Sequence, residues 1–164
     1  MKFVLPNDPI LHRPVPLFEG NPHSLRPLAK DMWRMMRSNL ISNYEASMQH
    51  EVFAKNARYD NGIGLAAPQV GHSVRMFVMQ LSGTKFNEAR VCINPEVLEF
   101  SSDAEDVEGC LTYPGFKKII HRPECVTVSF TCLKGMPRKG TLYGLAARCF
   151  QHELDHLNGK TIWE

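Results

Sequence analysis

The 164-residue sequence has few of the features that mark membrane or nucleic-acid-binding proteins. No apolar run approaches the roughly 18 residues that suggest a membrane span. The formal net charge is only +2, so the charge predicts neither a DNA nor a membrane partner. Pro6 and Pro9 interrupt the N-terminal apolar run, and an Arg-rich leader is missing. We therefore expect neither a secretory nor a transit signal, although an organellar enzyme without its leader would look the same.

The cysteines argue against a secreted, disulfide-bonded fold. There are five of them, an odd number, and a chain of this length does not need covalent cross-links. We expect a reducing compartment and free thiols, each of which is by default a small core side chain. Cys92, Cys125 and Cys132 lie in strand-like runs and are predicted to be such core residues.

The first third of the chain predicts an extended segment followed by a helix. We expect one domain over residues 1–164, long enough to bury a sizeable core. Residues 1–22 are rich in proline, and Ser24 is a candidate N-cap with Pro27 in the first helical turn. An apolar stripe then follows at helical spacing, which predicts core packing. The stripe consists of Leu25, Leu28, Met32, Met35 and Met36.

The rest of the chain predicts strands and then a second helix. Three runs have strand composition, and the last of them alternates two faces. They are residues 74–81, residues 91–93, which residues 96–100 can continue, and residues 125–133. Residues 101–109 are acidic and predict a loop or a strand edge, whereas residues 142–157 are helical in pattern. The predicted fold class is α+β, with antiparallel strands around a buried late helix and one earlier helix.

The late helix carries a candidate metal site in the stretch QHELDHLNG, residues 151–159. His152 and His156 are four residues apart, so both imidazoles lie on one helix face and can bind one ion. Glu153 is rotated by about 100° from His152, which suits a general base rather than a third ligand. Asp155 lies on another face, where it either orients a histidine or is solvated.

A third metal ligand has to come from upstream of the helix. The extended motif HExxHxxGxxH would need a histidine at Ile162, and few residues follow for a second helix with a glutamate. Cys110 is the favoured candidate, because Gly109 allows close backbone approach and a thiolate with two imidazoles is a known metal set. Cys149 is the competitor, but three ligands from one straight helix converge poorly, which favours core packing for it.

The motifs GIGLAAPQ, EGCL and QHELDHLNG, in this order, resemble those of the peptide deformylases, and the resemblance runs from about Leu5 to Gly159. It implies that Cys110, His152 and His156 bind the metal, with water or hydroxide in the fourth position. It also implies hydrolysis of the N-formyl group from the formyl-methionine of nascent polypeptides, with release of formate. Fe²⁺ is the favoured native ion, while Zn²⁺, Ni²⁺ or Co²⁺ suit the same ligands.

The resemblance also implies roles for residues around the metal. The side-chain amide of Gln69 and the backbone N–H of Leu111 match the oxyanion donors, and Glu153 matches the general base. Glu108 matches an acid near the site, which ties down Arg148 or neighbouring backbone, or else is an exposed loop carboxylate. The remaining matches predict substrate contacts and the methionine pocket. They are Ile63, Gly64, Gly109, Leu145, Arg148 and Cys149.

The sequence departs from the family pattern at three places. Thr112 replaces the serine of EGCLS, which keeps a hydroxyl and adds a methyl group. Residues 38–61 are longer than the usual link and are expected near the peptide entrance. The chain stops at Glu164, as in short-tailed members from phages or organelles, so ribosome docking through a long C-terminal tail is not expected. The family predicts a cytoplasmic enzyme of a bacterial or phage-infected cell, or an organellar one.

Two other functions are compatible with some of these residues. A zinc endopeptidase would share the HExxH motif, but Ile162 and the thiolate ligand argue against it. A non-catalytic metal or peptide-binding module would not need Glu153 and Gln69, which are both present. Release of formate from formyl-methionyl peptides separates the deformylase from both alternatives.

Overall fold

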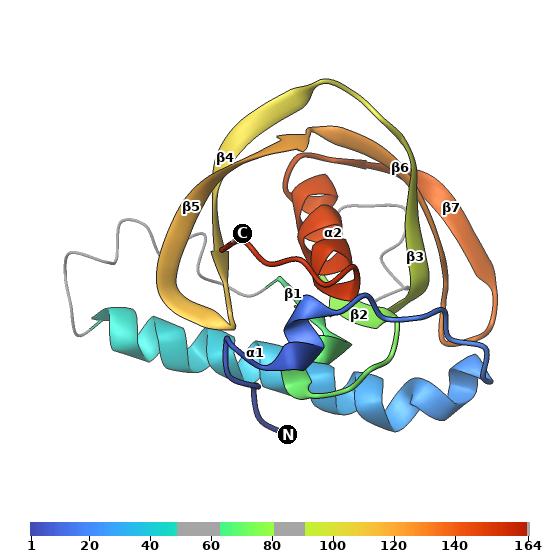
Figure 1. The fold of residues 1–164 in the computed structure, drawn as a ribbon, viewed down its shortest axis with the longest axis horizontal. Helices are drawn as coiled ribbons and strands as arrows, with labels where there is room; N and C mark the ends of the chain where they lie inside the picture. The colour runs from blue at the N-terminus through green and yellow to red at the C-terminus, as the bar shows by residue number, and fades with distance from the viewer. Residues whose placement is uncertain (49–62, 81–90, 164) are drawn as a thin grey trace.

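The structure is a computed structural model that describes residues 1–48, 63–80 and 91–163, with the backbone alone for residues 38–48. Helix α2, Gly144–Leu157, lies at the centre, and helix α1, Arg26–Met48, crosses below it (Figure 1). The remaining elements are strands and short 3₁₀ turns, of which η3, Ala67–Val70, lies near α2. Neither described helix is long and apolar enough to span a membrane.

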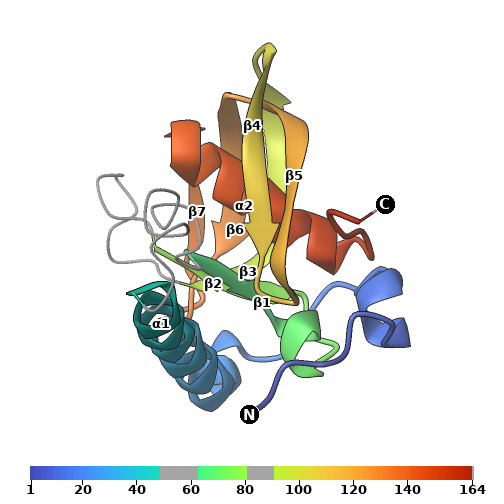
Figure 2. The same cartoon turned by 90° about the vertical axis from the view of Figure 1, so that its left-hand side faces the viewer.

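Five strands form one antiparallel sheet in the order β1-β2-β3-β6-β7. They are β1, Gly64–Ala66; β2, Met76–Met79; β3, Val91–Phe100; β6, Cys125–Thr131; and β7, Pro137–Tyr143. The other two, β4, Asp103–Cys110, and β5, Tyr113–Pro123, form a separate antiparallel hairpin. Figure 2 shows this hairpin standing beside α2. The predicted α+β class, with antiparallel strands around the late helix, is confirmed.

The sheet separates two hydrophobic cores, and β2 contributes to both. Successive side chains of a strand point to opposite faces. Phe77 and Met79 pack in the core with α2, whereas Met76 and Val78 pack in the core with α1. The ring of Phe77 makes an edge contact with Phe150 of α2, with centroids 5.1 Å apart. The buried α2 face is therefore held against the sheet.

Several element predictions need correction. Ser24 lies inside the 3₁₀ turn η2, Pro22–Leu25, which Asn21 caps by accepting from the backbone N–H of His23. By contrast, the continuation of residues 91–93 into residues 96–100 is confirmed, since β3 runs through Asn94-Pro95 to Phe100. The register shifts between Ile93 and Glu96, where Asn94 has φ 50° and its side-chain amide bonds the backbone N–H and C=O of Phe18. The predicted late helix begins two residues later than expected, since Leu142 lies in β7.

The acidic residues 101–109 are mostly strand, since β4 covers Asp103–Cys110. Strands β5 and β7 were not predicted at all. The predicted alternation of residues 125–133 is confirmed, because Val126, Val128, Phe130 and Cys132 are buried and their neighbours less so. Within residues 38–61, α1 continues to Met48, and residues 49–61 lie outside the described part of the chain.

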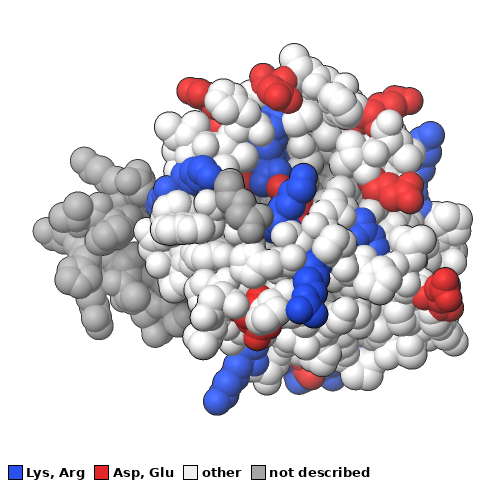
Figure 3. Space-filling model, in the orientation of Figure 1, with Lys and Arg blue, Asp and Glu red and all other residues white. Residues whose placement is uncertain are grey.

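Basic and acidic side chains are interspersed on the face seen in Figure 3, most of which is uncharged. This agrees with a net charge of only +2. The charged groups that matter for the site are instead buried between α2 and the hairpin.

Candidate metal centre

Three side chains meet where α2 faces the end of the β4–β5 hairpin. His152 and His156 lie one turn apart on α2, with ring centroids 5.0 Å apart. Cys110 is the last residue of β4, and its Sγ lies 3.3 Å from Nε2 of His156. One ligand atom from each of the three residues lies within 4.8 Å of the other two, and all three side chains are buried. The upstream thiol expected from the sequence thus lies beside the histidine pair.

The donor chemistry of this cluster fits a divalent transition metal. Burial holds the pKa of His156 well below its usual range, so its imidazole is neutral and has a lone pair to donate. Its buried Nδ1 has no hydrogen-bond partner among the described residues. A thiolate with two imidazoles suits zinc, iron, cobalt or nickel. The competing Cys149 is outside this cluster and packs with core residues of the sheet.

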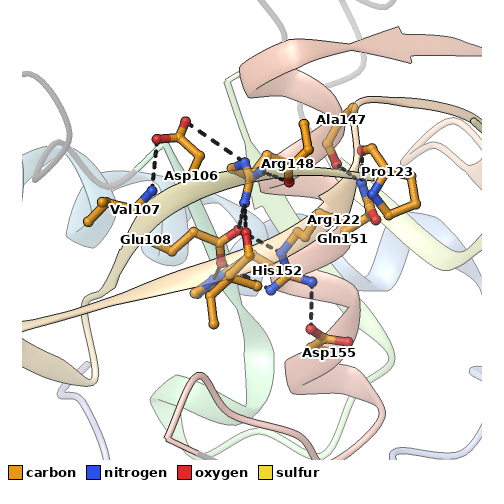
Figure 4. A network of polar contacts seen from close by, with 12 residues as sticks. Asp106, Val107, Glu108, Arg122, Pro123, Ala147, Arg148, Gln151, His152 and Asp155 are labelled. Carbon is orange, nitrogen blue, oxygen red and sulfur yellow. Dashed lines mark hydrogen bonds and ion pairs between the residues drawn. The ribbon is translucent and has the colours of Figure 1, made fainter. Parts of the chain in front are cut away.

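Glu108 fixes the orientation of the His152 ring (Figure 4). Its Oε2 lies 3.0 Å from Nδ1 of His152. Burial would raise the pKa of Glu108, but hydrogen bonds from His152 and Arg122 outweigh it and lower that pKa to about 2. An ionised carboxylate only accepts hydrogen bonds, so we assign the Nδ1 proton to His152 as donor. With Nδ1 bound to Glu108, Nε2 is the ring nitrogen of His152 that remains for the cluster with Cys110 and His156.

The hydrogen bonds of His152 also shift its pKa. Burial would lower the pKa of His152, but its hydrogen bonds with Cys110 and Glu108 raise it to about 10. A metal ion bound here would need this ring in its neutral form, which couples metal affinity to pH.

Glu108 is also the charge partner of two arginines. Nε of Arg122 donates to Glu108 Oε1 at 2.6 Å, and Nη2 donates to Oε2 at 3.0 Å. Nη1 of Arg148 donates to Oε1 at 2.9 Å. Glu108 is only 6% exposed, so the alternative of an exposed loop carboxylate is wrong, and its predicted tie to Arg148 is confirmed.

Arg148 and Arg122 join helix and hairpin into one unit. Arg148 of α2 also donates to the backbone carbonyls of Ile120 and Ala104, at 2.9 and 2.8 Å, on the two hairpin strands. Arg122 of β5 donates in the other direction, to Asp155 Oδ2 of α2 at 2.7 Å. Asp155 therefore binds an arginine. This differs from both expected roles, which were to orient a histidine or to be simply solvated.

Glu153 lies against strand β1. It is 3% exposed, and its Oε2 has no hydrogen-bond partner among the described residues. Burial outweighs the nearby positive charge of His152 and raises the pKa of Glu153 to about 7. Gly64 makes room for the carboxylate, because a Cβ there would lie 2.5 Å from Glu153 Oε1. Such a carboxyl group can both accept and release a proton near neutral pH.

The predicted oxyanion donors lie on two other elements. Gln69 belongs to η3 and is 1% exposed, and its Nε2 lies 3.5 Å from Cys110 Sγ. Leu111 follows Cys110 directly, in the turn between β4 and β5. The thiol, the Gln69 amide and the Leu111 backbone are thus close together.

The predicted pocket residues lie on three elements. Ile63 and Gly64 lie at β1, where a Cβ at Gly64 would also meet Cys149 Sγ at 2.7 Å. Gly109 lies in β4 beside Cys110. Of the α2 residues, Cys149 is buried, Arg148 is engaged with Glu108, and Leu145 is 54% exposed. Their contact with substrate stays a prediction.

Sequence reasoning missed two residues of the site. Arg122 carried no signal, because it lies in a strand that was not predicted and its partners are far away in sequence. Thr112 was noted only as a replacement of serine, whereas its Oγ1 accepts a hydrogen bond from Gln69 Nε2 at 3.0 Å.

Comparisons with known proteins agree with this geometry. The family model for polypeptide deformylase matches residues 1–164. Peptide deformylase from Dictyoglomus thermophilum is 35% identical over 155 residues, which cover 94% of this chain and 85% of that protein. The crystal structure of peptide deformylase from Thermotoga maritima has a TM-score of 0.75 at 31% identity, covering 99% of this chain and 94% of the other.

The structure of a Vibrio parahaemolyticus bacteriophage deformylase, solved in complex with actinonin, has a TM-score of 0.78 at 29% identity. The match covers 99% of this chain and 100% of the phage protein. The chain belongs to the polypeptide deformylase family, whose members are metal-dependent hydrolases that remove the formyl group from nascent polypeptides.

Proposed function

We propose that this chain hydrolyses the formyl group of N-terminal formyl-methionine, with Cys110, His152 and His156 as the ligands of one divalent metal ion. The closeness of the three ligand atoms, all within 4.8 Å of one another, is the observation that carries this proposal. When bound, the ion supplies Lewis-acid chemistry and lowers the pKa of a water molecule toward neutrality. Family resemblance favours Fe²⁺ as the native ion, and zinc, nickel and cobalt suit the same ligands.

Glu153 is the proposed general base and acid. It takes a proton from the water that attacks the formyl carbon, and it later delivers that proton to the leaving amine nitrogen. The carbon–nitrogen bond breaks, which leaves formate and a free N-terminus. Two observations support this role: the buried Oε2 has no hydrogen-bond partner in the described part of the chain, and the pKa is raised to about 7.

The amide of Gln69 and the backbone N–H of Leu111 are the proposed donors to the oxyanion that forms during the attack. One such donor is worth about 3–4 kcal/mol of the reaction barrier. Their position beside Cys110 supports the assignment, because the formyl oxygen has to lie close to the proposed ligands.

We propose that the methionine side chain and the adjoining backbone are bound between β1, β4 and α2. The residues assigned to this contact are Ile63, Gly64, Gly109, Leu145, Cys149 and the carbon stem of Arg148. Cys149 is buried against Gly64, which supports an apolar end for the pocket. The substrate class implies action on nascent chains in the cytoplasm of a bacterial or phage-infected cell, or in an organelle.

The test is formate release from a formyl-methionyl peptide by anaerobically purified, metal-loaded protein. Glu153→Gln should reduce kcat by roughly 10²- to 10⁴-fold while the metal content stays the same, because the amide cannot carry the proton. Normal turnover by Glu153→Gln would refute the general base. Cleavage of unformylated peptides without formate release would support an endopeptidase. Tight binding of the formyl-methionyl peptide without turnover would support a binding module.

A further inference from the structure

The side chain of Gln69 is held at both ends of its amide group. Its Oε1 accepts a hydrogen bond from the backbone N–H of Ala66 at 2.8 Å. Its Nε2 donates to Thr112 Oγ1 at 3.0 Å. Gln69 and Thr112 are 1% and 4% exposed, so water does not compete for these bonds. The amide therefore has one orientation.

The Ala66 contact settles which end of the amide is oxygen. A backbone N–H can only donate, so the atom that faces Ala66 must be the acceptor Oε1. The NH₂ group then faces the turn between β4 and β5. Its two hydrogens lie in the plane of the amide, about 120° apart, so fixing the direction of one fixes the other.

The two acceptors of this NH₂ group are Thr112 Oγ1 and Cys110 Sγ, the latter 3.5 Å away. We propose that Thr112 is a positioning residue: its hydroxyl takes one N–H of Gln69 and thereby turns the other toward Cys110, the side on which the substrate oxygen gains negative charge next to the proposed metal ligands. This inference rests on the proposed function, in which Gln69 is an oxyanion donor. Thr112 itself does not touch the reacting atoms.

The turn geometry explains how Thr112 comes to this position. Cys110 pairs with Tyr113, so Leu111 and Thr112 are the only two residues of the turn between them. One short turn thus presents the thiol of Cys110, the backbone N–H of Leu111 and the hydroxyl of Thr112. The bond from Thr112 to Gln69 also holds the turn against η3. The serine of the family pattern would supply the same hydroxyl, so the added methyl of threonine is compatible with this role.

Two substitutions at residue 112 separate the hydroxyl from the methyl group. Thr112→Val keeps the shape but removes the acceptor, and it should lower kcat by roughly 10- to 100-fold, as expected when a donor loses its alignment. KM should change by less than about threefold, because the alignment matters most in the transition state. Thr112→Ser, which keeps the hydroxyl, should retain most of kcat. Thr112→Ala is the second variant if Thr112→Val does not fold.

A double-mutant cycle tests whether Thr112 acts through Gln69. In a Gln69→Ala background, Thr112→Val should cause no further loss of kcat, because the group that it positions is absent. An equal loss in both backgrounds would overturn the proposal, and so would full kcat in Thr112→Val.

A readout independent of turnover is the side-chain amide signal of Gln69 in ¹⁵N NMR spectra of the zinc-loaded protein. In Thr112→Val the two amide protons should shift and exchange faster with water, whereas in Thr112→Ser they should not, with equal zinc affinity in all three proteins. An unchanged Gln69 signal in Thr112→Val would overturn the proposal. Failure of the wild type to release formate would instead overturn the proposed function, while the amide signal would still decide the role of Thr112.

Discussion

Oε2 of Glu108 lies 3.0 Å from Nδ1 of His152. This contact links strand β4, which carries the candidate ligand Cys110, to helix α2, which carries the candidate ligands His152 and His156. The same carboxylate binds Arg122 and Arg148. Glu108 thus joins the two elements and orients one ring at once. Its removal should affect both metal affinity and folding stability.

Glu108→Gln should lower metal affinity by roughly 10- to 100-fold, because His152 loses the carboxylate that orients its ring. It should also lower the free energy of unfolding by about 3–5 kcal/mol, since two largely buried arginines lose the most buried of their carboxylate partners, although Arg122 keeps its bond to Asp155. Competition with a chelator and urea unfolding measure the two effects. Glu105→Gln on the same strand is the control, because Glu105 is 65% exposed and pairs only weakly with His121, at 3.5 Å. Equal metal affinity in both variants would contradict the role of Glu108.

Replacement of the metal by Co²⁺ should give a thiolate-to-cobalt charge-transfer band in the near ultraviolet, because a soft thiolate ligand donates charge to the ion. Cys110→Ser should abolish that band. Cys149→Ser should keep it, since Cys149 lies outside the ligand cluster. A band that survives in Cys110→Ser and disappears in Cys149→Ser would show that the wrong thiol was assigned.

Gly64→Ala should displace Glu153. The added Cβ would lie 2.5 Å from Glu153 Oε1 and 2.7 Å from Cys149 Sγ, so at least one side chain has to move. We expect kcat to fall by roughly 100-fold, because a displaced carboxylate no longer lies in the geometry that the reaction needs. The metal should remain bound. In a Glu153→Gln background the same substitution should cost little more. A similar loss in both backgrounds would mean that Gly64 acts independently of Glu153.

Gly159→Ala should destabilise the end of α2. Gly159 has φ 73°, and a Cβ there would lie 2.7 Å from the carbonyl carbon of Arg13. The loss of free energy of unfolding should exceed the roughly 1–2 kcal/mol that a left-handed conformation alone costs. Gly135→Ala is the matched control, because Gly135 has φ 75° and nothing within 4 Å of a Cβ. Equal losses in a urea titration would exclude a contribution from the Arg13 contact.

Local geometry explains why the helical part of the candidate site could be predicted. The spacing of His152 and His156 places both rings on one face of any helix, because an α-helix has 3.6 residues per turn. The alternation of residues 125–131 likewise follows from the pleat of a strand. These predictions needed no knowledge of how the elements pack.

Strands β5 and β7 were missed for the opposite reason. Their sequences, YPGFKKIIHRP and PRKGTLY, contain proline, glycine and charged residues that disfavour strands. Pairing with β4 and β6 outweighs these local preferences. Since β5 was missed, the role of Arg122 was missed with it.

The sequence by itself determined that the two imidazoles share one face of α2 and that Glu153 lies on a different face from them. Both follow from the backbone repeat of a single helix. Only the tertiary structure decided which distant groups complete the site. The hydrogen bonds from His152 to Glu108, from Arg122 to Asp155 and from Gln69 to Thr112 join residues 33 to 44 positions apart. Such contacts depend on how the hairpin, η3 and α2 dock. The two hydrophobic cores and the bonds of Arg122 and Arg148 set that docking together, rather than any one segment.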